Sequence, residues 1–116
     1  MTDQEYCRKM AELEGKKIIT DSEGKQFEQI IYRGKETVIG LPDYRKDLNA
    51  QARVTELLQD QLCNATGVYW SCDIKHPYNN ELPWTVALSG GSFWEGYEGE
   101  HKDLKEALWR ALCKAI

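Results

Sequence analysis

The sequence predicts an α+β protein in which helices pack on a small, mainly antiparallel sheet of four or five strands, with layers like those of an α-β-α sandwich. Its 116 residues fit a single domain over 1–116. Three segments carry apolar residues at helical spacing, and β-branched and aromatic runs typical of strands lie between them. Hairpin-length loops favour antiparallel pairing, so the apolar stripes of the helices are expected to cover the sheet.

The first third of the chain is expected to form a short helix followed by a strand hairpin. Thr2 or Asp3 can cap the helix, and Gly15 supplies a stop. Pro42 ends the strand pairing, because proline has no N–H to donate to a neighbouring strand. Between these points, strand-like runs lie at residues 17–20, 27–33 and 37–41.

The most regular element is a long amphipathic helix that starts between Asp43 and Lys46 and ends at Asn64. Thr66 and Gly67 then stop it. The stripe expected to face the core contains Leu48, Ala52, Thr55, Leu58 and Leu62, widened by Val54 and Leu57. The residues expected to face outward are Gln51, Arg53, Glu56, Gln59 and Asp60.

A second group of strands and a last helix complete the chain. Strands are expected at residues 68–76 and 83–89, and residues 93–97 form either a third strand or a loop. Alternation places Val68, Trp70, Cys72 and Ile74 on one face, and Trp84, Val86 and Leu88 on one face of the partner strand. The helix at 102–115 carries an Ala- and Leu-rich stripe. Trp109 lies beside that stripe, where it would cover a sheet edge or form a subunit contact.

Composition and charge exclude several classes of protein. A net charge of −4 argues against direct binding of duplex DNA, because Lys and Arg contacts to phosphate supply most of that affinity. The N-terminus lacks an apolar leader, and no apolar run approaches the roughly 20 residues that span a bilayer. We therefore expect a cytoplasmic protein without a membrane partner. Its four cysteines are expected to be free thiols in a reducing cytosol.

One short segment resembles a known family. Leu41-Pro42-Asp43-Tyr44, followed by Asp47-Leu48-Asn49-Ala50, is similar to the Pro-Asp-Tyr…Asp-Leu-Asn-Ala box of small phage and prophage proteins. The helix, Trp-bearing hairpin and Ala-rich terminal helix that follow resemble the phage ABA sandwich domain. The resemblance implies a phage-encoded accessory protein that binds a host factor in the bacterial cytoplasm, including defence nucleases and their guides. The family offers no catalytic residues to carry over.

The same box also has a structural interpretation. Pro42 closes a strand, Asp43 can cap the following turn, and Asp47 lies near the N-terminus of the long helix. Tyr44 is expected to pack on the sheet edge. We weight this interpretation above a direct contact with a ligand.

The sequence offers little support for an enzyme, and we predict no catalytic residue, metal or cofactor. Cys72 and His76 share a strand face but lie about 13 Å apart at the rise of a strand, which is too far for a thiolate–imidazole pair. Asp43 and Asp47 are four residues apart and can hold Mg²⁺, although capping explains both. A small metal-dependent hydrolase or nuclease that uses Asp43, Asp47, Cys72 or His76 is the third-ranked function.

The segment with the clearest binding composition is the glycine-rich stretch 90–100, which combines aromatic and acidic residues. Aromatic side chains are frequent anchors at interfaces, and acids can meet a basic patch. The expected binding surface consists of Phe93, Trp94, Glu95, Tyr97, Glu98 and Glu100. The alternative is that the aromatic residues finish the core and the glutamates are simply solvated.

The leading hypothesis is therefore a non-enzymatic phage or prophage accessory protein that binds a host protein or ribonucleoprotein. One form is an anti-CRISPR-like inhibitor of a nucleic-acid-targeting defence system, in which acidic residues occupy a basic channel. The alternative is a structural or self-associating phage protein, a homodimer with Trp109 and a sheet edge at the contact.

Overall fold

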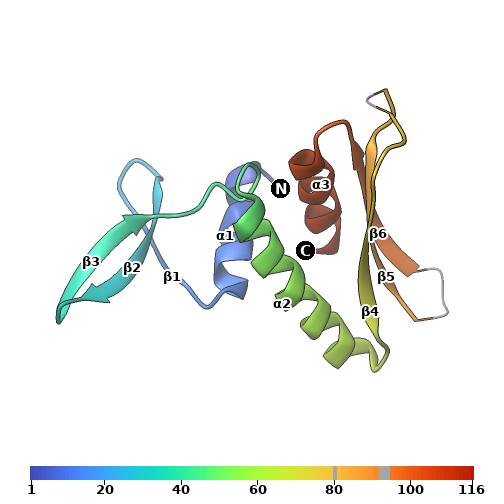
Figure 1. The fold of residues 1–116 in the computed structure, drawn as a ribbon. Coiled ribbons are helices and arrows are strands. Elements are labelled where there is room, and N and C mark those ends of the chain that lie inside the picture. The colour runs from blue at the N-terminus through green and yellow to red at the C-terminus, as the bar shows by residue number, and fades with distance from the viewer. Residues whose placement is uncertain (80, 92–94) are drawn as a thin grey trace.

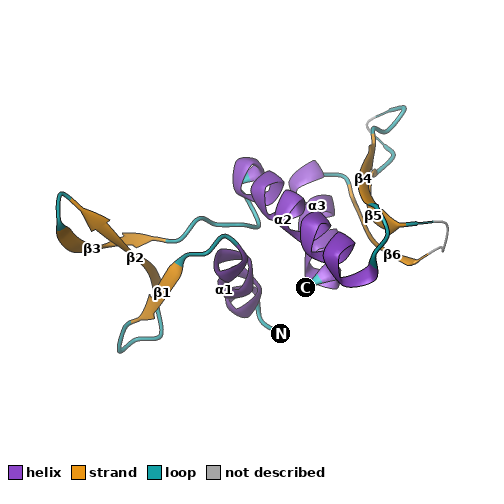
Figure 2. Cartoon of the chain, turned by 90° about the horizontal axis from the view of Figure 1, so that it is seen from below, coloured by secondary structure: helices purple, strands orange, loops and turns teal. Residues whose placement is uncertain are grey.

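The computed structural model describes residues 1–79, 81–91 and 95–116, without the side chain of Glu95. Helices alternate with groups of strands along the chain, and the helices gather in the middle of the molecule (Figures 1 and 2). The elements are α1 (Asp3–Leu13), β1 (Lys17–Thr20), β2 (Gln26–Tyr32), β3 (Lys35–Gly40), α2 (Leu48–Thr66), β4 (Trp70–Lys75), β5 (Trp84–Gly90), β6 (Glu95–His101) and α3 (Leu104–Ala115). The α+β class is confirmed.

Within the described residues the strands form two separate three-stranded sheets, both antiparallel, with orders β1-β2-β3 and β4-β5-β6. The sequence predicts one sheet of four or five strands, and the structure differs in this respect. The two sheets stay apart because the chain leaves β3, turns at residues 44–46 and enters α2, which places the helices between them (Figure 1). Helices cover only one face of the second sheet, so this part of the protein has two layers rather than the three of an α-β-α sandwich.

Local capping explains where the helices begin and end. Thr2 and Glu5 form a reciprocal capping box at the start of α1, and Asp47 accepts a hydrogen bond from Ala50 N at the start of α2. Gly67 ends α2 with φ of 73°, a left-handed conformation that favours glycine. The predicted starts and stops of both helices are confirmed to within a few residues.

The core lies between the three helices and the inner face of the second sheet. Its fully buried side chains include Met10, Tyr44, Val54, Leu88 and Leu112. These come from α1, the segment before α2, α2, β5 and α3, so the core joins residues from across the chain. The body is therefore closed without β2 or β3.

The predicted inward stripe of α2 is partly wrong. Gln51 was expected to face solvent but is fully buried, and its Nε2 donates to the carbonyl oxygens of Arg45 at 3.2 Å and Lys105 at 2.9 Å. Leu48 and Ala52 were expected to face the core but are exposed. The helix is rotated because Gln51 bridges to the first turn of α3, a partner that the periodicity of α2 alone does not reveal.

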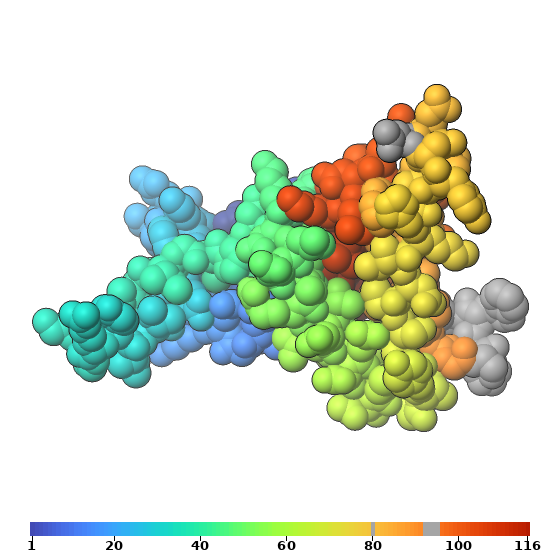
Figure 3. Space-filling model, in the orientation of Figure 1, coloured from blue at the N-terminus to red at the C-terminus, as the bar shows by residue number. Residues whose placement is uncertain are grey.

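The first sheet projects from the body as an arm (Figures 1 and 3). Its base is held by Ile18, which packs on the core, and by Lys16, whose Nζ contacts Glu28 at 3.2 Å. Toward the tip, Ile31 is 78% exposed and Tyr32 is also exposed. The radius of gyration is 16.0 Å, against about 13 Å for a compact chain of this length. The arm accounts for the elongated shape.

Among the described residues, no helix combines the length and apolar character needed to cross a membrane.

Candidate functional site

The outer face of the second sheet is the side that no helix covers, and we take it as the candidate site. The register places Ala87 of the central strand opposite Asp73 of β4 on one side and Glu98 of β6 on the other. The next row contains Lys75, Thr85 and Glu100, and the third contains Ser71, Ser89 and Gly96.

Small side chains form the floor of this outer face, and charged side chains rise from its two edges, Asp73 and Lys75 on β4 and Glu98 and Glu100 on β6. Thr85, Ala87 and Ser89 of β5 are half-buried, whereas Asp73, Glu98 and the other charged residues of the face are exposed. Because neighbouring strands lie about 4.8 Å apart, the acids on β4 and β6 stand about 10 Å from each other across the flat floor. With three acids and one base, the arrangement suits a basic partner surface.

Cations of α3 lie along the β6 edge of this face. Arg110 donates to the Glu100 carbonyl oxygen at 3.0 Å, and Lys114 donates to the Glu98 carbonyl oxygen at 2.6 Å. They bind backbone rather than the glutamate side chains, so the two carboxylates remain directed to solvent. The negative charges therefore lie on the outer face of the sheet and not along its β6 edge.

The structure divides the predicted binding surface. Glu98 and Glu100 lie on the outer face, but Tyr97 lies on the inner face, stacked on Trp70 with ring centroids 6.0 Å apart and packed against the core. Its row explains the difference, because Tyr97 is opposite the buried Leu88. Phe93 and Trp94 lie outside the described residues, and Glu95 is described by its backbone only.

The inner face meets α3 at unusually close range. Gly99 of β6 lies directly under the helix, so a Cβ atom there would come within 2.6 Å of Ala111 N and closer still to Ala107 O. Glycine at this position allows the backbone of α3 to rest on the strand. The outer face is thus supported from behind by a helix packed at backbone distance.

The Pro-Asp-Tyr box holds the helices together. Tyr44 is fully buried near Cys7 and Glu14, not at a sheet edge as expected, because the turn at 44–46 directs it toward α1. Its hydroxyl oxygen and Glu14 Oε1 are both buried without a well-formed hydrogen bond among the described residues. Burial and the neighbouring Glu14 carboxylate raise the pKa of Tyr44.

Arg45 of the box ties α2 to the other helices. Its guanidinium donates to both carboxylate oxygens of Glu106 at 2.8 and 2.6 Å, and to Asp3 at 2.6 Å. The hydrogen bonds from Arg45 hold the pKa of Glu106 below its usual value. These contacts place the box in the structural role that its capping residues indicate.

Trp109 is used within the chain rather than offered to a partner. It is 4% exposed and packs edge-to-face on Tyr6 of α1, with ring centroids 6.0 Å apart. A second subunit would therefore find little of the indole ring to contact. Trp109 lies beside the apolar stripe of α3, as predicted, but α1 covers it.

The residues considered for an enzyme are not assembled into a catalytic arrangement. Asp43 accepts a hydrogen bond from Arg45 N, and Asp47 caps α2. His76 packs edge-to-face on Trp84. Over residues 1–79, 81–91 and 95–116, no three His, Cys, Asp or Glu side chains gather closely enough to hold a metal ion.

The thiols are also poorly suited to nucleophilic chemistry. Burial is the main cause of a raised pKa at Cys7 and Cys72. Burial, aided by the Asp3 charge, raises the pKa of Cys113 to about 12. Because the thiolate is the reactive form, a raised pKa lowers the nucleophilic reactivity of these three thiols near neutral pH.

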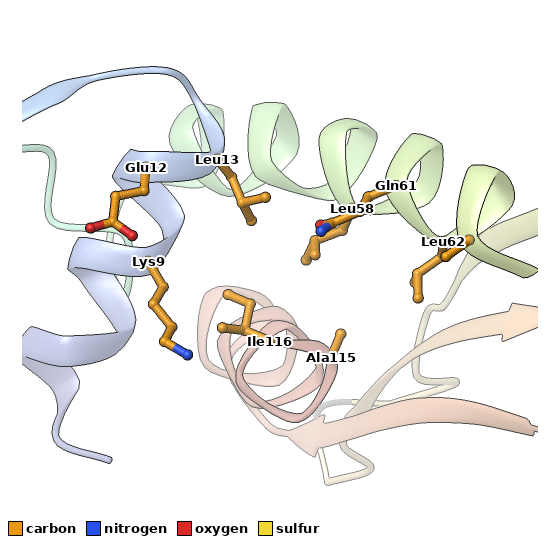
Figure 4. Close-up of a pocket in the computed structure, with 9 residues that line it drawn as sticks. Lys9, Glu12, Leu13, Leu58, Gln61, Leu62, Ala115 and Ile116 are labelled. Atoms are coloured by element: carbon orange, nitrogen blue, oxygen red, sulfur yellow. The ribbon is translucent and has the colours of Figure 1, made fainter.

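A cavity of about 530 Å³ opens between α1, α2 and the end of α3 (Figure 4). Its walls are mainly aliphatic, and the polar side chains that line it are Lys9, Glu12 and Gln61. Glu12 is exposed and paired with Arg8 at 3.1 Å. The cavity can accept an apolar group, but it brings together no nucleophile and base.

Asp73 and Lys75 are charged residues of the outer face that lie outside the predicted binding surface. Strand alternation alone shows only that Asp73 lies on the other face of the strand from Trp70 and Cys72. Its proximity to Glu98 depends on two successive strand registers, β4 with β5 and β5 with β6. A longer acidic pattern on β4 would have been needed to find it from the sequence.

Comparison with known proteins shows similarity at the level of the fold. No protein-family model matches the chain, and no curated protein sequence matches it either. A 2.0 Å crystal structure of a phage protein from Bacillus cereus ATCC 14579 aligns with a TM-score of 0.54 and 16% sequence identity, over 97% of this chain and 90% of that one. At this identity the similarity supports the arrangement of helices and strands.

Proposed function

We propose that this chain is a phage or prophage accessory protein that acts as a non-enzymatic binding module on a host protein or ribonucleoprotein. The observation that carries the proposal is the uncovered outer face of β4–β6, where three acids, Asp73, Glu98 and Glu100, outnumber the single base Lys75 around a floor of small side chains. The fold similarity to a Bacillus cereus phage protein supports a phage origin. The proposed location of the protein is the cytoplasm of the host bacterium.

The chemistry of the outer face favours a basic partner. A flat acidic surface can enter a channel lined with Lys and Arg and compete there with nucleic acid. Inhibition of a nucleic-acid-targeting defence system is the specific form of the proposal. An enzymatic role is not proposed, because Asp43 and Asp47 accept backbone hydrogen bonds and burial raises the pKa of Cys72.

The test compares capture from a bacterial lysate by immobilised wild type and by a charge-reversed variant. The variant Asp73→Lys/Glu98→Lys/Glu100→Lys should lose the captured partner and keep a normal melting temperature, because all three side chains are exposed. The matched control Glu23→Lys/Glu56→Lys/Asp60→Lys changes the net charge equally at exposed positions outside the outer face of β4–β6. Equal capture by both variants would remove the outer face from consideration.

A further inference from the structure

The two edges of the second sheet are both covered, at least in part, by side chains from helices. On β6, Arg110 and Lys114 bind the carbonyl oxygens of Glu100 and Glu98. On β4, Gln59 donates to the Trp70 carbonyl oxygen at 3.3 Å. On β6 the engaged carbonyl groups hinder the addition of another strand, whereas on β4 the contact reaches only the first residue of the strand.

The edge of the first sheet at β3 lacks this protection. Among the described residues, no side chain from another element hydrogen-bonds to the backbone of Lys35–Gly40, and the strand pairs only with β2. Val38 is 51% exposed and Ile39 is 41% exposed. An open edge that carries exposed β-branched residues is a ready template for strand addition.

The molecule also exposes more surface than a compact protein of its mass. Its accessible surface is 7856 Å², against about 6,500 Å² expected for a monomer of this mass. The surplus exceeds the roughly 800 Å² that each partner contributes to a standard interface. Neither face of the arm is covered toward its tip, and a small sheet without a covered face is only marginally stable alone.

We propose that a second copy of this chain binds the arm through antiparallel pairing of β3 with β3, which forms a continuous six-stranded sheet. A two-fold axis normal to the sheet can place Val38 opposite Val38 of the other copy. In this register Glu36 lies opposite Gly40, and Thr37 lies opposite Ile39, so no like charges meet across the two strands.

The charge of the arm favours a second copy of the chain over a strongly charged partner. Residues 16–40 contain five basic and four acidic side chains, so the arm is nearly neutral although the whole chain has a net charge of −4. Two arms can therefore approach without strong repulsion. The arm lies on the opposite side of the helices from β4–β6 (Figures 1 and 2), so the dimer presents two outer faces to solvent.

The test is sedimentation velocity of the full chain over a range of concentrations. Wild type should show a monomer–dimer equilibrium, and Val38→Lys should weaken it at least about tenfold, because it places two lysines opposite each other at the two-fold axis. The control is Ile74→Lys, since Ile74 is 49% exposed and also lies on an edge strand. It should leave the equilibrium unchanged.

A second variant tests the register without adding charge. Val38→Cys should form a disulfide-linked dimer under mild oxidation, whereas Ile74→Cys and wild type should not exceed the background of the four native thiols. Wild type that stays monomeric at every concentration would overturn the proposal and leave the edge to a strand from another protein. Equal dimerisation by wild type and Val38→Lys would overturn it as well.

Because the outer-face variant of the proposed function leaves the arm intact, capture and dimerisation can fail independently. Loss of capture by the outer-face variant with normal dimerisation would support the outer face alone, and loss of dimerisation in Val38→Lys with normal capture would support the β3 interface alone.

Discussion

Replacement of Gly99 by alanine tests the close contact between α3 and the second sheet. The added Cβ would lie 2.6 Å from Ala111 N and nearer to Ala107 O, both backbone atoms of the helix. Carbon contacts are most favourable at about 3.5–4.0 Å, so α3 must move away from β6 by about 1 Å or more. Overpacking of this kind costs about 1–3 kcal/mol, and the rigid backbone partners favour the upper end.

A loss of about 3 kcal/mol in the free energy of unfolding corresponds to a fall of about 10–15 °C in melting temperature for a chain of this length. Differential scanning calorimetry of Gly99→Ala against Gly40→Ala measures it. Gly40 is also a strand glycine, but a Cβ there would meet nothing within 4 Å. We expect Gly40→Ala to melt like wild type. If both variants melt like wild type, α3 does not rest on Gly99 as described.

Three further predictions concern the box and its neighbours. Tyr44→Phe should change the free energy of unfolding by less than about 1 kcal/mol, because the hydroxyl lacks a well-formed hydrogen bond, whereas Tyr44→Ala should cost about 3–5 kcal/mol in urea titrations. Arg45 lowers the pKa of Glu106 in the folded state. The ion pair therefore stabilises the fold above the unfolded-state pKa near 4.5, and this stabilisation is lost as the pH falls through the folded-state pKa. The difference in melting temperature between wild type and Glu106→Gln should therefore shrink in acid. Cys113, with a pKa raised to about 12, should react with a thiol reagent far more slowly in the native protein than in denaturant, and equal rates would contradict its burial.

The sequence was sufficient for the individual elements because their signals are local. Thr2, Asp47 and Gly67 lie within a few residues of the backbone groups that they satisfy, so the ends of α1 and α2 could be predicted. The inner faces of β4 and β5 also followed from alternation over a few residues. These parts required no knowledge of distant contacts.

The parts that could not be predicted depend on partners far along the chain. Gln51 is buried because Lys105 offers a carbonyl group 54 residues later. Tyr97 turns inward because its row contains Leu88 and its ring stacks on Trp70. For the same reason, only Glu98 and Glu100 of the six residues of the predicted binding surface are located on the outer face, and Asp73 could be added to them only from the register.

The separation of the arm from the core has a consequence for local opening. The body buries its apolar residues without help from β2 or β3, so the arm can lose its pairing while the three helices stay packed. Opening free energies in a protein range from near zero to the global value, and they follow such cooperative units. Amide hydrogens of β3 should therefore exchange with solvent well before those of β5, and protection of β3 that grows with protein concentration would report the second copy directly.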